Sequence, residues 1–265
     1  MDLELSGRVA VVTGGSRGIG RAIARELAME GADVAIVARG EDALARTAEE
    51  LGMETRRRVV PIVADTADVD SVRAMVARVH EIFGRIDILV NNAATPGGGA
   101  PPSLSELTQT HFDSDMNVKV MGYLRCAQAV APIMQSGGWG RIINIAGLSS
   151  RVAGSIMGSM RNVSVAAMTK NLASMLGPYG INVTVVHPGA TRTERTAATI
   201  AQQASDRGIP EVEIERELSS ASSIGRLVSA QEVAWVVTFL ASPRSISING
   251  DAVTVGGGFG NAIHY

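Results

Sequence analysis

The stretch Thr13-Gly14-Gly15-Ser16-Arg17-Gly18-Ile19-Gly20 decides the fold of this chain. The apolar, β-branched run at 9–12 predicts a buried strand before it, and the repeat Ile19, Ile23, Leu27 predicts a helix after it. Such a turn lets the backbone approach an anion, which then faces free N–H groups and the positive end of the helix dipole. A tight turn without a ligand is the alternative, but the flanking strand and helix favour phosphate binding.

The composition is that of a globular protein, with 46% hydrophobic and 19% charged residues among 265. A formal net charge of −2 gives no reason to expect nucleic acid or an anionic membrane as a partner. The single cysteine, Cys126, excludes an internal disulfide and indicates a reducing compartment. The histidines have no metal-ligand spacing, and no stretch predicts a signal peptide or a membrane span. We therefore expect a cytoplasmic protein that holds no metal ion.

Strand-like and helical segments alternate along the whole chain. Strands are predicted at 9–12, 34–37, 59–64, 86–90, 141–145, 181–186 and 252–255, and helices at 41–51, 69–83, 112–135, 157–176 and 231–240. This alternation predicts an α/β fold, a Rossmann-type doubly wound parallel sheet of about seven strands with helices on both faces. Residues 191–223 are polar and helix-prone, without a strand signal.

The candidate functional residues follow the predicted strands directly. Ligands of doubly wound sheets bind at the carboxyl ends of the strands, so these residues are expected to meet at one edge. They are Gly14–Gly20, Arg39, Asp65, Asn91–Ala94, Ala146–Ser150 and His187–Gly189.

Motifs spread over nearly the whole chain resemble those of the short-chain dehydrogenase/reductase family. They are Thr13-Gly14-x-x-x-Gly18-x-Gly20, Asn91-Asn92-Ala93-Ala94 (with alanine where glycine is usual), Asn117, Pro188-Gly189 with Thr193, Gly225-Arg226, and Gly250–Gly257. The resemblance implies a single dinucleotide-binding domain over 1–265 and a nicotinamide dinucleotide laid across the sheet edge. The implied cofactor-binding residues are Gly14, Ser16, Arg17, Gly18, Ile19, Gly20, Arg39, Asp65, Thr66, Asn91, Ala93, Pro188, Gly189 and Thr193. A helix cap at Asp65 and a plain turn at Pro188-Gly189 are the alternatives.

The end of the second strand favours NADP(H) over NAD(H). A ribose 2′-hydroxyl favours a carboxylate there, whereas a 2′-phosphate needs cationic donors. This chain has Arg39 and no carboxylate, and Arg17 lies in the glycine turn close by. Two guanidinium groups can clamp one phosphate with bidentate hydrogen bonds, although two solvated surface arginines are the alternative.

The usual proton-transfer residues of the family are missing from their positions. The family's chemistry uses a tyrosine, a lysine four residues later and an upstream serine. None of Tyr123, Tyr179 and Tyr265 has a lysine four residues on. Counting back from the helix that contains Lys170, the tyrosine and lysine positions fall on Gly158 and Asn162. Counting forward from the strand, the serine position falls on Gly147 and the tyrosine lies near Met160. Lys119 is expected on a helix surface.

Three interpretations follow from this departure. The first, which we favour, is an active NADP(H)-dependent oxidoreductase with a non-standard proton donor, in which Asn117, Ser149 and Ser155 are the candidate catalytic residues and Arg161 supplies charge. The second is a non-catalytic NADP(H)-binding protein, such as a sensor, scaffold or inactive subunit. The third is a reaction that does not need the tyrosine. Loop and cap roles are the alternative for each serine.

The substrate side is predicted from segments outside the motifs. Residues 191–223 stand where the family carries a substrate lid, and Gly97-Gly98-Gly99 would form the opposite lip. Met121, Met157 and Met160 are candidates for an adaptable apolar wall. These features suggest a small, fairly apolar carbonyl or alcohol as substrate. The resemblance also implies a homotetramer or homodimer, formed through the helix at 118–131 and the last strand.

Overall fold

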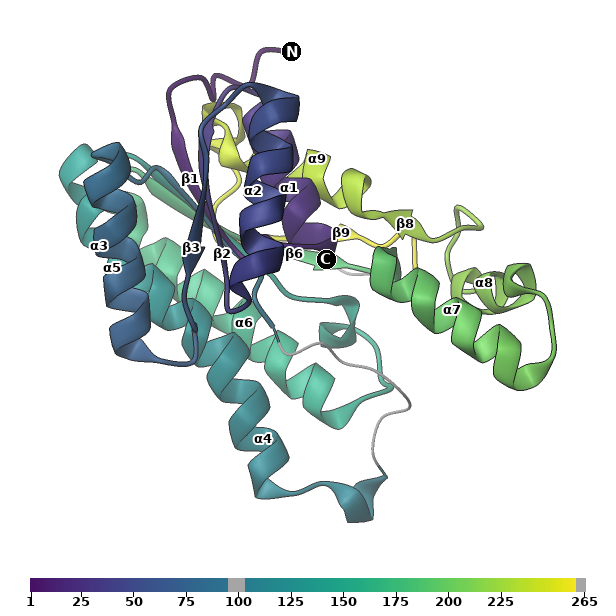
Figure 1. Ribbon diagram of the computed structural model, residues 1–265. Coiled ribbons are helices and arrows are strands. Elements are labelled where there is room, and N and C mark those ends of the chain that lie inside the picture. The colour runs from purple at the N-terminus through teal and green to yellow at the C-terminus, as the bar shows by residue number, and fades with distance from the viewer. Residues whose placement is uncertain (95–102, 261–265) are drawn as a thin grey trace.

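The computed structural model describes residues 1–94 and 103–260. A seven-stranded sheet in the order β3-β2-β1-β4-β5-β6-β9 forms the centre of the molecule (Figure 1). Its strands are β1 (Val9–Thr13), β2 (Asp33–Ala38), β3 (Val59–Val63), β4 (Ile88–Asn91), β5 (Gly140–Ile145), β6 (Ile181–Pro188) and β9 (Ala252–Val255). All neighbouring strands are parallel, which confirms the predicted fold class.

The strand order reverses between β1 and β4. From β1 the chain builds outward to β2 and β3, and from β4 it builds the other way to β5, β6 and β9. The register aligns Thr13 with Val37 and Asn91 with Asn144, so the carboxyl ends of the central strands lie at one edge. A crevice outside such a reversal is where ligands of doubly wound sheets bind.

Helices cover both faces of the sheet. On one face lie α1 (Gly18–Met29), α2 (Glu41–Thr55) and α9 (Ala230–Ala241), and on the other lie α3 (Val69–Phe83), α5 (Gly122–Gly137) and α6 (Ile156–Leu176) (Figure 1). Side chains alternate along β1, because successive residues of a strand point to opposite faces. Ala10 and Val12 therefore pack into the core under α1 and α9, whereas Val9 and Val11 pack under α3 and α5. The second core also contains Cys126, which is fully buried.

The predicted helix at 112–135 is built from three consecutive pieces. They are α4 (Gln109–Asp115), a π-helical turn (Met116–Met121) and α5. In the wide turn the Gly122 N–H donates to the carbonyl of Asn117, five residues earlier, whereas an α-helix bonds four residues back. Lys119 lies in this turn and is only 5% exposed, so the prediction that it lies on a helix surface is wrong.

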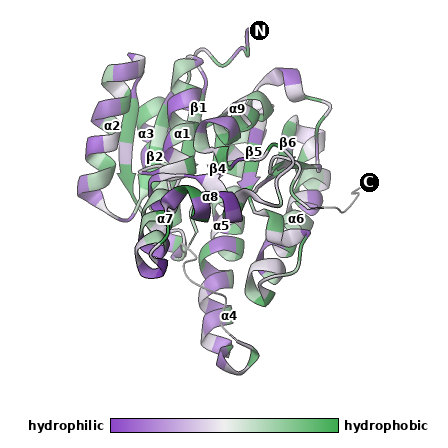
Figure 2. Ribbon diagram, turned by 90° about the vertical axis from the view of Figure 1, so that its right-hand side faces the viewer, coloured by the Kyte–Doolittle hydropathy of each residue, from purple (hydrophilic) through white to green (hydrophobic). Residues whose placement is uncertain are grey.

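The segment that follows β6 projects away from the sheet (Figure 1). It contains α7 (Glu194–Arg207) and α8 (Glu211–Ser219), whose outer faces are largely polar (Figure 2). A small separate core joins the two helices through Ile200, Ala204 and Ile214. The segment also begins with a two-residue strand, β7 (Thr191–Arg192), which pairs with β8 (Val228–Ser229). No strand was predicted there, because two residues are too few to show a period.

Short 3₁₀ helices complete the described elements at Leu104–Glu106, Leu148–Ser150, Gly177–Tyr179 and Pro243–Ser245. Within the described residues, no helix has the length and apolarity needed to cross a membrane, and no group of side chains has the composition of a metal site.

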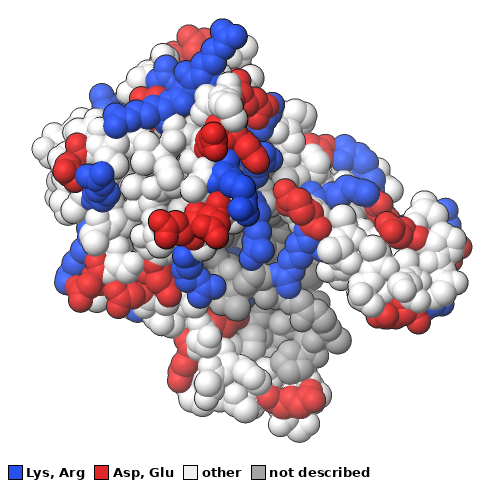
Figure 3. Space-filling view, in the orientation of Figure 1, with Lys and Arg blue, Asp and Glu red and all other residues white. Residues whose placement is uncertain are grey.

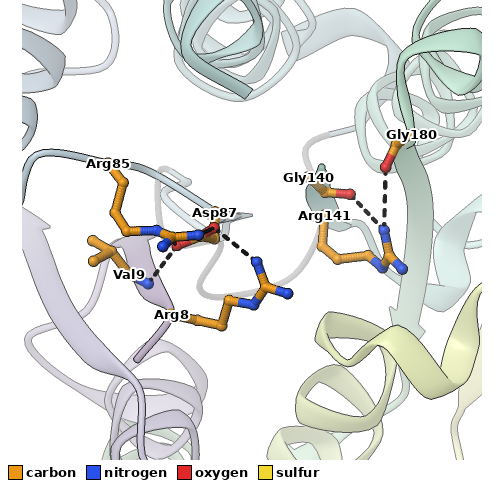
Figure 4. A network of polar contacts seen from close by, with 7 residues as sticks. All are labelled: Arg8, Val9, Arg85, Asp87, Gly140, Arg141 and Gly180. Carbon is orange, nitrogen blue, oxygen red and sulfur yellow. Dashed lines mark hydrogen bonds and ion pairs between the residues drawn. The ribbon is translucent and has the colours of Figure 1, made fainter. Parts of the chain in front are cut away.

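A buried carboxylate ties the amino ends of the central strands together (Figure 4). Asp87 accepts two hydrogen bonds from the Arg85 guanidinium, at 2.7 and 2.6 Å, and one from Arg8 at 3.2 Å. It also accepts from the backbone N–H of Val9 at 2.9 Å. Arg141 lies nearby, forms no ion pair with a carboxylate of the described residues, and donates to backbone carbonyls, including that of Gly140 at 2.8 Å. This network lies at the edge of the sheet opposite the predicted site.

Candidate functional site

A cavity of about 360 Å³ lies at the carboxyl ends of β1 to β4. The glycine turn after β1 forms one wall, and the residues that follow the other strands complete it. The predicted cofactor residues in its lining are Gly14, Ser16, Arg17, Ile19, Arg39, Asp65, Thr66, Ala93 and Thr193.

The glycine turn needs its small residues because the backbone is crowded there. Gly14 has a φ of +66°, which side chains rarely adopt. A Cβ on Gly20 would lie 2.2 Å from the carbonyl oxygen of Gly14, so only glycine lets α1 begin this close to β1. The Gly18 N–H at the start of α1 already binds an anionic group, the Glu194 carboxylate at 3.2 Å. The turn therefore has the open backbone and the polarity that a phosphate requires.

Two arginines stand at the outer end of this cavity. Arg17 and Arg39 are both exposed, and neither forms an ion pair with a carboxylate in the described part of the chain. Figure 3 shows basic side chains at the centre of this face, beside the α7–α8 projection. The guanidinium groups are therefore available to an anionic ligand.

A second cavity, of about 510 Å³, continues along the same edge past β5 and β6. It shares Ile19 and Thr193 with the first cavity, so the two spaces adjoin. Pro188, Gly189 and Thr193, predicted for the nicotinamide end, all line it. Its apolar lining consists mainly of Ile19, Ile145, Leu148, Val152 and Phe259, and its polar side chains include Ser149, Arg161 and Asn162.

A chain of polar side chains leads from the interior to the second cavity. The Nζ of Lys119 donates to the Ala146 carbonyl at 2.9 Å and to Oδ1 of Asn162 at 3.0 Å. The Nδ2 of Asn162 then donates to Oγ of Ser149 at 2.6 Å. These side chains come from the π-helical turn, from α6 and from the 3₁₀ helix after β5. Lys119 was not identified as a site residue from the sequence. The signal that could have identified it is a lysine within the mainly apolar stretch 118–124.

Burial controls the ionisation of the groups around this chain. Burial, with a smaller contribution from the Arg161 charge and against the opposing effect of Asp115, lowers the pKa of Lys119 to about 7. Arg161 and Asp115 form a partly buried ion pair, so most of the Arg161 charge is already matched. Burial also lowers the pKa of His187 to about 4, so its ring is neutral near pH 7. The Nδ1 of His187 lies 3.1 Å from both the Gly147 carbonyl and the Ser150 hydroxyl.

Five predicted site residues lie outside the linings of both cavities: Gly18 and Gly20, which belong to the glycine turn itself, and Asn91, Asn117 and Ser155. Asn117 accepts a hydrogen bond from Arg125 at 2.7 Å and donates to the Ala67 carbonyl at 3.5 Å, so its amide is engaged beside α3. Ser155 caps α6 by accepting a hydrogen bond from the Gly158 N–H at 3.0 Å. This is the cap role that the sequence analysis gives as the alternative to a catalytic role. Asn91 is buried and donates to Asn144 at 2.9 Å behind the cavity wall. Of the three candidate catalytic residues, only Ser149 lines a cavity.

No tyrosine of the described chain lines either cavity. The Tyr123 hydroxyl donates to the Ile145 carbonyl at 2.9 Å, and burial raises its pKa far above the ordinary value. Tyr179 is exposed after α6, and Tyr265 lies outside the described residues. Gly158 is one of the two positions at which the sequence analysis places the family's tyrosine. It is buried, and a Cβ there would lie 3.0 Å from Oγ of Ser155.

The predicted methionine wall does not form. Met121 and Met160 are 42% and 46% exposed on the outside of the molecule, and Met157 is absent from both linings. Leu148, Val152 and Phe259 supply apolar surface instead. The predicted lip at Gly97-Gly98-Gly99 lies outside the described residues.

Comparison with known proteins identifies the class of this chain. The model of a family described as enoyl-(acyl carrier protein) reductase matches residues 14–260. The putative ketoacyl reductase of Streptomyces coelicolor is 37% identical over 263 residues, which cover 96% of this chain and 97% of that protein. The short-chain reductase protein NovJ of Streptomyces niveus is 35% identical over 251 residues, covering 94% and 93%. The chain therefore belongs to the short-chain dehydrogenase/reductase family.

Solved structures agree with this assignment. The L-sorbose reductase of Gluconobacter frateurii, crystallised with NADPH and L-sorbose, matches with a TM-score of 0.92 and 31% identity over 98% of each chain. The relatives of this chain thus include reductases that use NADPH.

Proposed function

We propose that this protein is an NADP(H)-dependent oxidoreductase that acts on a small, fairly apolar carbonyl compound or on the corresponding alcohol. The observation that carries the proposal is the pair of adjoining cavities that meet at Ile19 and Thr193. One cavity offers a glycine turn and two arginines without carboxylate partners in the described chain, and the other has a mainly apolar wall with the Ser149 hydroxyl in it.

The first cavity suits a dinucleotide for reasons of backbone geometry and charge. The N-terminal N–H groups of α1 would hold the pyrophosphate, and Gly14, Gly18 and Gly20 leave room for it. Asp65 and Thr66 would contact the adenine, and Arg17 and Arg39 the 2′-phosphate. Pro188, Gly189 and Thr193 would enclose the nicotinamide end at the second cavity.

The reaction needs a hydride, a proton and a group that stabilises the oxygen. When bound, NADPH supplies the hydride to the carbonyl carbon and leaves as NADP⁺. The Ser149 hydroxyl donates a hydrogen bond to the carbonyl oxygen as negative charge develops on it. Serine is too weak an acid to be the source of the proton, so water entering the cavity protonates that oxygen to give the alcohol, and the hydroxide left behind takes up a proton from bulk solvent. This non-standard proton delivery replaces the family's tyrosine.

The cofactor preference is tested by Arg39→Ala. We expect the variant to bind NADPH more weakly by about 1.5–3 kcal/mol, the scale of charged hydrogen bonds, and to bind NADH almost unchanged. Arg46→Ala is the matched control, because Arg46 is exposed on the neighbouring α2 and lines neither cavity. Equal losses for both cofactors would defeat the NADP(H) assignment.

Turnover distinguishes an enzyme from a binding protein. NADPH absorbance is followed with a panel of ketones, aldehydes and activated alkenes, with NADH in parallel. Steady loss of NADPH with one class supports the proposal. The second candidate, a non-catalytic NADP(H)-binding protein, is favoured by the lack of a tyrosine in both cavities of the described chain. NADPH binding without turnover across the panel would select it.

We also propose that the protein forms a homodimer or homotetramer through the helix at 118–131 and the last strand. Ile156, Met160 and Val163 are about half exposed and follow one another at helical spacing on α6, beside α5. A second copy would cover this apolar stripe. Light scattering of the purified protein tests this, and a monomer at micromolar concentration would contradict it.

A further inference from the structure

The hydrogen bonds from Lys119 to Ser149 have a fixed direction. The Nζ of Lys119 donates to both the Ala146 carbonyl and Oδ1 of Asn162, and the neutral amine and the ammonium each have enough N–H groups for both bonds, so the amide of Asn162 turns its oxygen toward Lys119. Its NH₂ group then faces Ser149, and the 2.6 Å contact makes Oγ of Ser149 the acceptor. Because Oγ accepts from Asn162, its own hydrogen is free to point into the second cavity. A hydroxyl held in this way is a donor, which suits a carbonyl oxygen.

Neither Lys119 nor Asn162 has another clear purpose in the fold. A lysine is almost never fully buried unless it is paired, because desolvating its charge is costly. Lys119 is 5% exposed and makes no ion pair with a described carboxylate; the nearby Asp115 is bound to Arg161. Leucine or methionine would fill the same space without that cost. Asn162 is 2% exposed, and its amide oxygen and nitrogen are used by Lys119 and Ser149.

The local sequence leaves space around the chain of hydrogen bonds. A Cβ on Gly147 would lie 3.3 Å from Nδ2 of Asn162, and one on Gly158 would lie 3.3 Å from Oγ of Ser149. Side chains at either position would press on the Asn162–Ser149 contact. The π-helical turn aims Lys119 at Asn162 from the opposite side.

We propose that Lys119 and Asn162 are positioning residues that hold the Ser149 hydroxyl as the hydrogen-bond donor to the substrate's carbonyl oxygen. This inference rests on the proposed function, because it assigns a role in the same reaction. Lys119 acts from the interior through Asn162, and Ser149 alone touches the substrate.

Steady-state kinetics with NADPH and cyclohexanone, or with the best ketone of the panel, test the proposal. The variants are Ser149→Ala, Lys119→Met, Asn162→Ala and the double variant Lys119→Met/Ser149→Ala. Lys170→Met is the matched control, since Lys170 is the only other lysine of the chain and is exposed on α6. Circular dichroism and the Kd of NADPH establish that each variant is folded and binds the cofactor.

We expect Ser149→Ala to lower kcat by roughly 10²-fold, the scale of losing one oxyanion donor. Lys119→Met and Asn162→Ala should each lower kcat by about 10-fold with the KM of NADPH unchanged, and the double variant should be no slower than Ser149→Ala alone. Should Lys119→Met fail to fold, Asn162→Ala and the double variant Asn162→Ala/Ser149→Ala test the same coupling.

The outcomes separate this inference from the proposed function. An active wild type in which Lys119→Met matches Lys170→Met, or in which the penalties at 119 and 149 multiply, would overturn the inference alone. A wild type that reduces no ketone of the panel would overturn the proposed function, and this inference with it.

Discussion

Replacing Lys119 with methionine should remove a pH dependence of stability that the wild type shows above pH 7. The lysine is buried, and its pKa is lowered from 10.5 to about 7 in the folded protein. Between these two values the unfolded chain binds a proton that the folded chain does not. The free energy of unfolding therefore rises as pH rises from 7 toward 10.5, and this contribution is lost as pH falls.

The magnitude follows from the two pKa values. Each pH unit over which only the unfolded state is protonated is worth about 1.4 kcal/mol, and at pH 7 the folded state is half protonated. From pH 7 to pH 9 the Lys119 contribution is therefore about 2 kcal/mol. The charged and titratable groups that face Lys119 add little of their own: Arg161 and Asp115 are paired, His187 is neutral, and Tyr123 stays protonated.

Urea unfolding at pH 7, 8 and 9 measures this effect. The difference between wild type and Lys119→Met cancels the titration of other groups, and Lys170→Met controls for the loss of a lysine as such. We expect the wild type to gain about 2 kcal/mol more than Lys119→Met over this range. If the free energy of unfolding of the wild type rises by less than about 0.5 kcal/mol more than that of Lys119→Met, Lys119 keeps its proton in the folded protein, and the argument from burial is wrong.

Three further changes test other parts of the structure. Asp87→Ala should lower the free energy of unfolding by about 2–4 kcal/mol in urea titration, because it leaves the Val9 N–H and two arginines without their acceptor; a loss under about 1 kcal/mol would contradict this. Glu194→Gln should tighten NADPH binding about 2- to 5-fold by calorimetry, since the carboxylate on the Gly18 N–H competes with the pyrophosphate; unchanged or weaker binding, or the same gain in the control Glu211→Gln, would argue against competition. Gly20→Ala should weaken NADPH binding by at least about 10-fold, since its Cβ would push α1 away from the Gly14 carbonyl; wild-type affinity would show that the turn can relax.

The sheet and its functional edge could be predicted from the sequence because both depend on local patterns. Runs such as 9–12 and 181–186 are long and apolar, so they identify buried strands, and parallel pairing then fixes where the following residues meet. Gly14, Arg39 and Asp65 consequently line one cavity although they are far apart in the chain.

The proton-transfer side of the site could not be predicted in the same way. The π-helical turn changes the direction in which the Lys119 side chain projects from the helix, and no residue pattern at 116–121 predicts that change. Ser155 and Asn117 are types that suit catalysis, but serine also caps helices, and the Asn117 amide meets Arg125 only in the folded chain. Residue type alone did not separate these roles.

The wide turn at Met116–Met121 makes the chemistry of this site sensitive to chain length. An α-helix advances about 100° per residue, so deleting one residue within the turn would restore regular winding and swing the amine of Lys119 away from the interior. The helix on one side of the deletion could keep its contacts with the sheet, but the helix on the other side would be rotated and would lose them. A single-codon deletion within the turn is therefore a second route, besides substitution of Lys119 itself, by which a descendant of this protein would lose the buried amine.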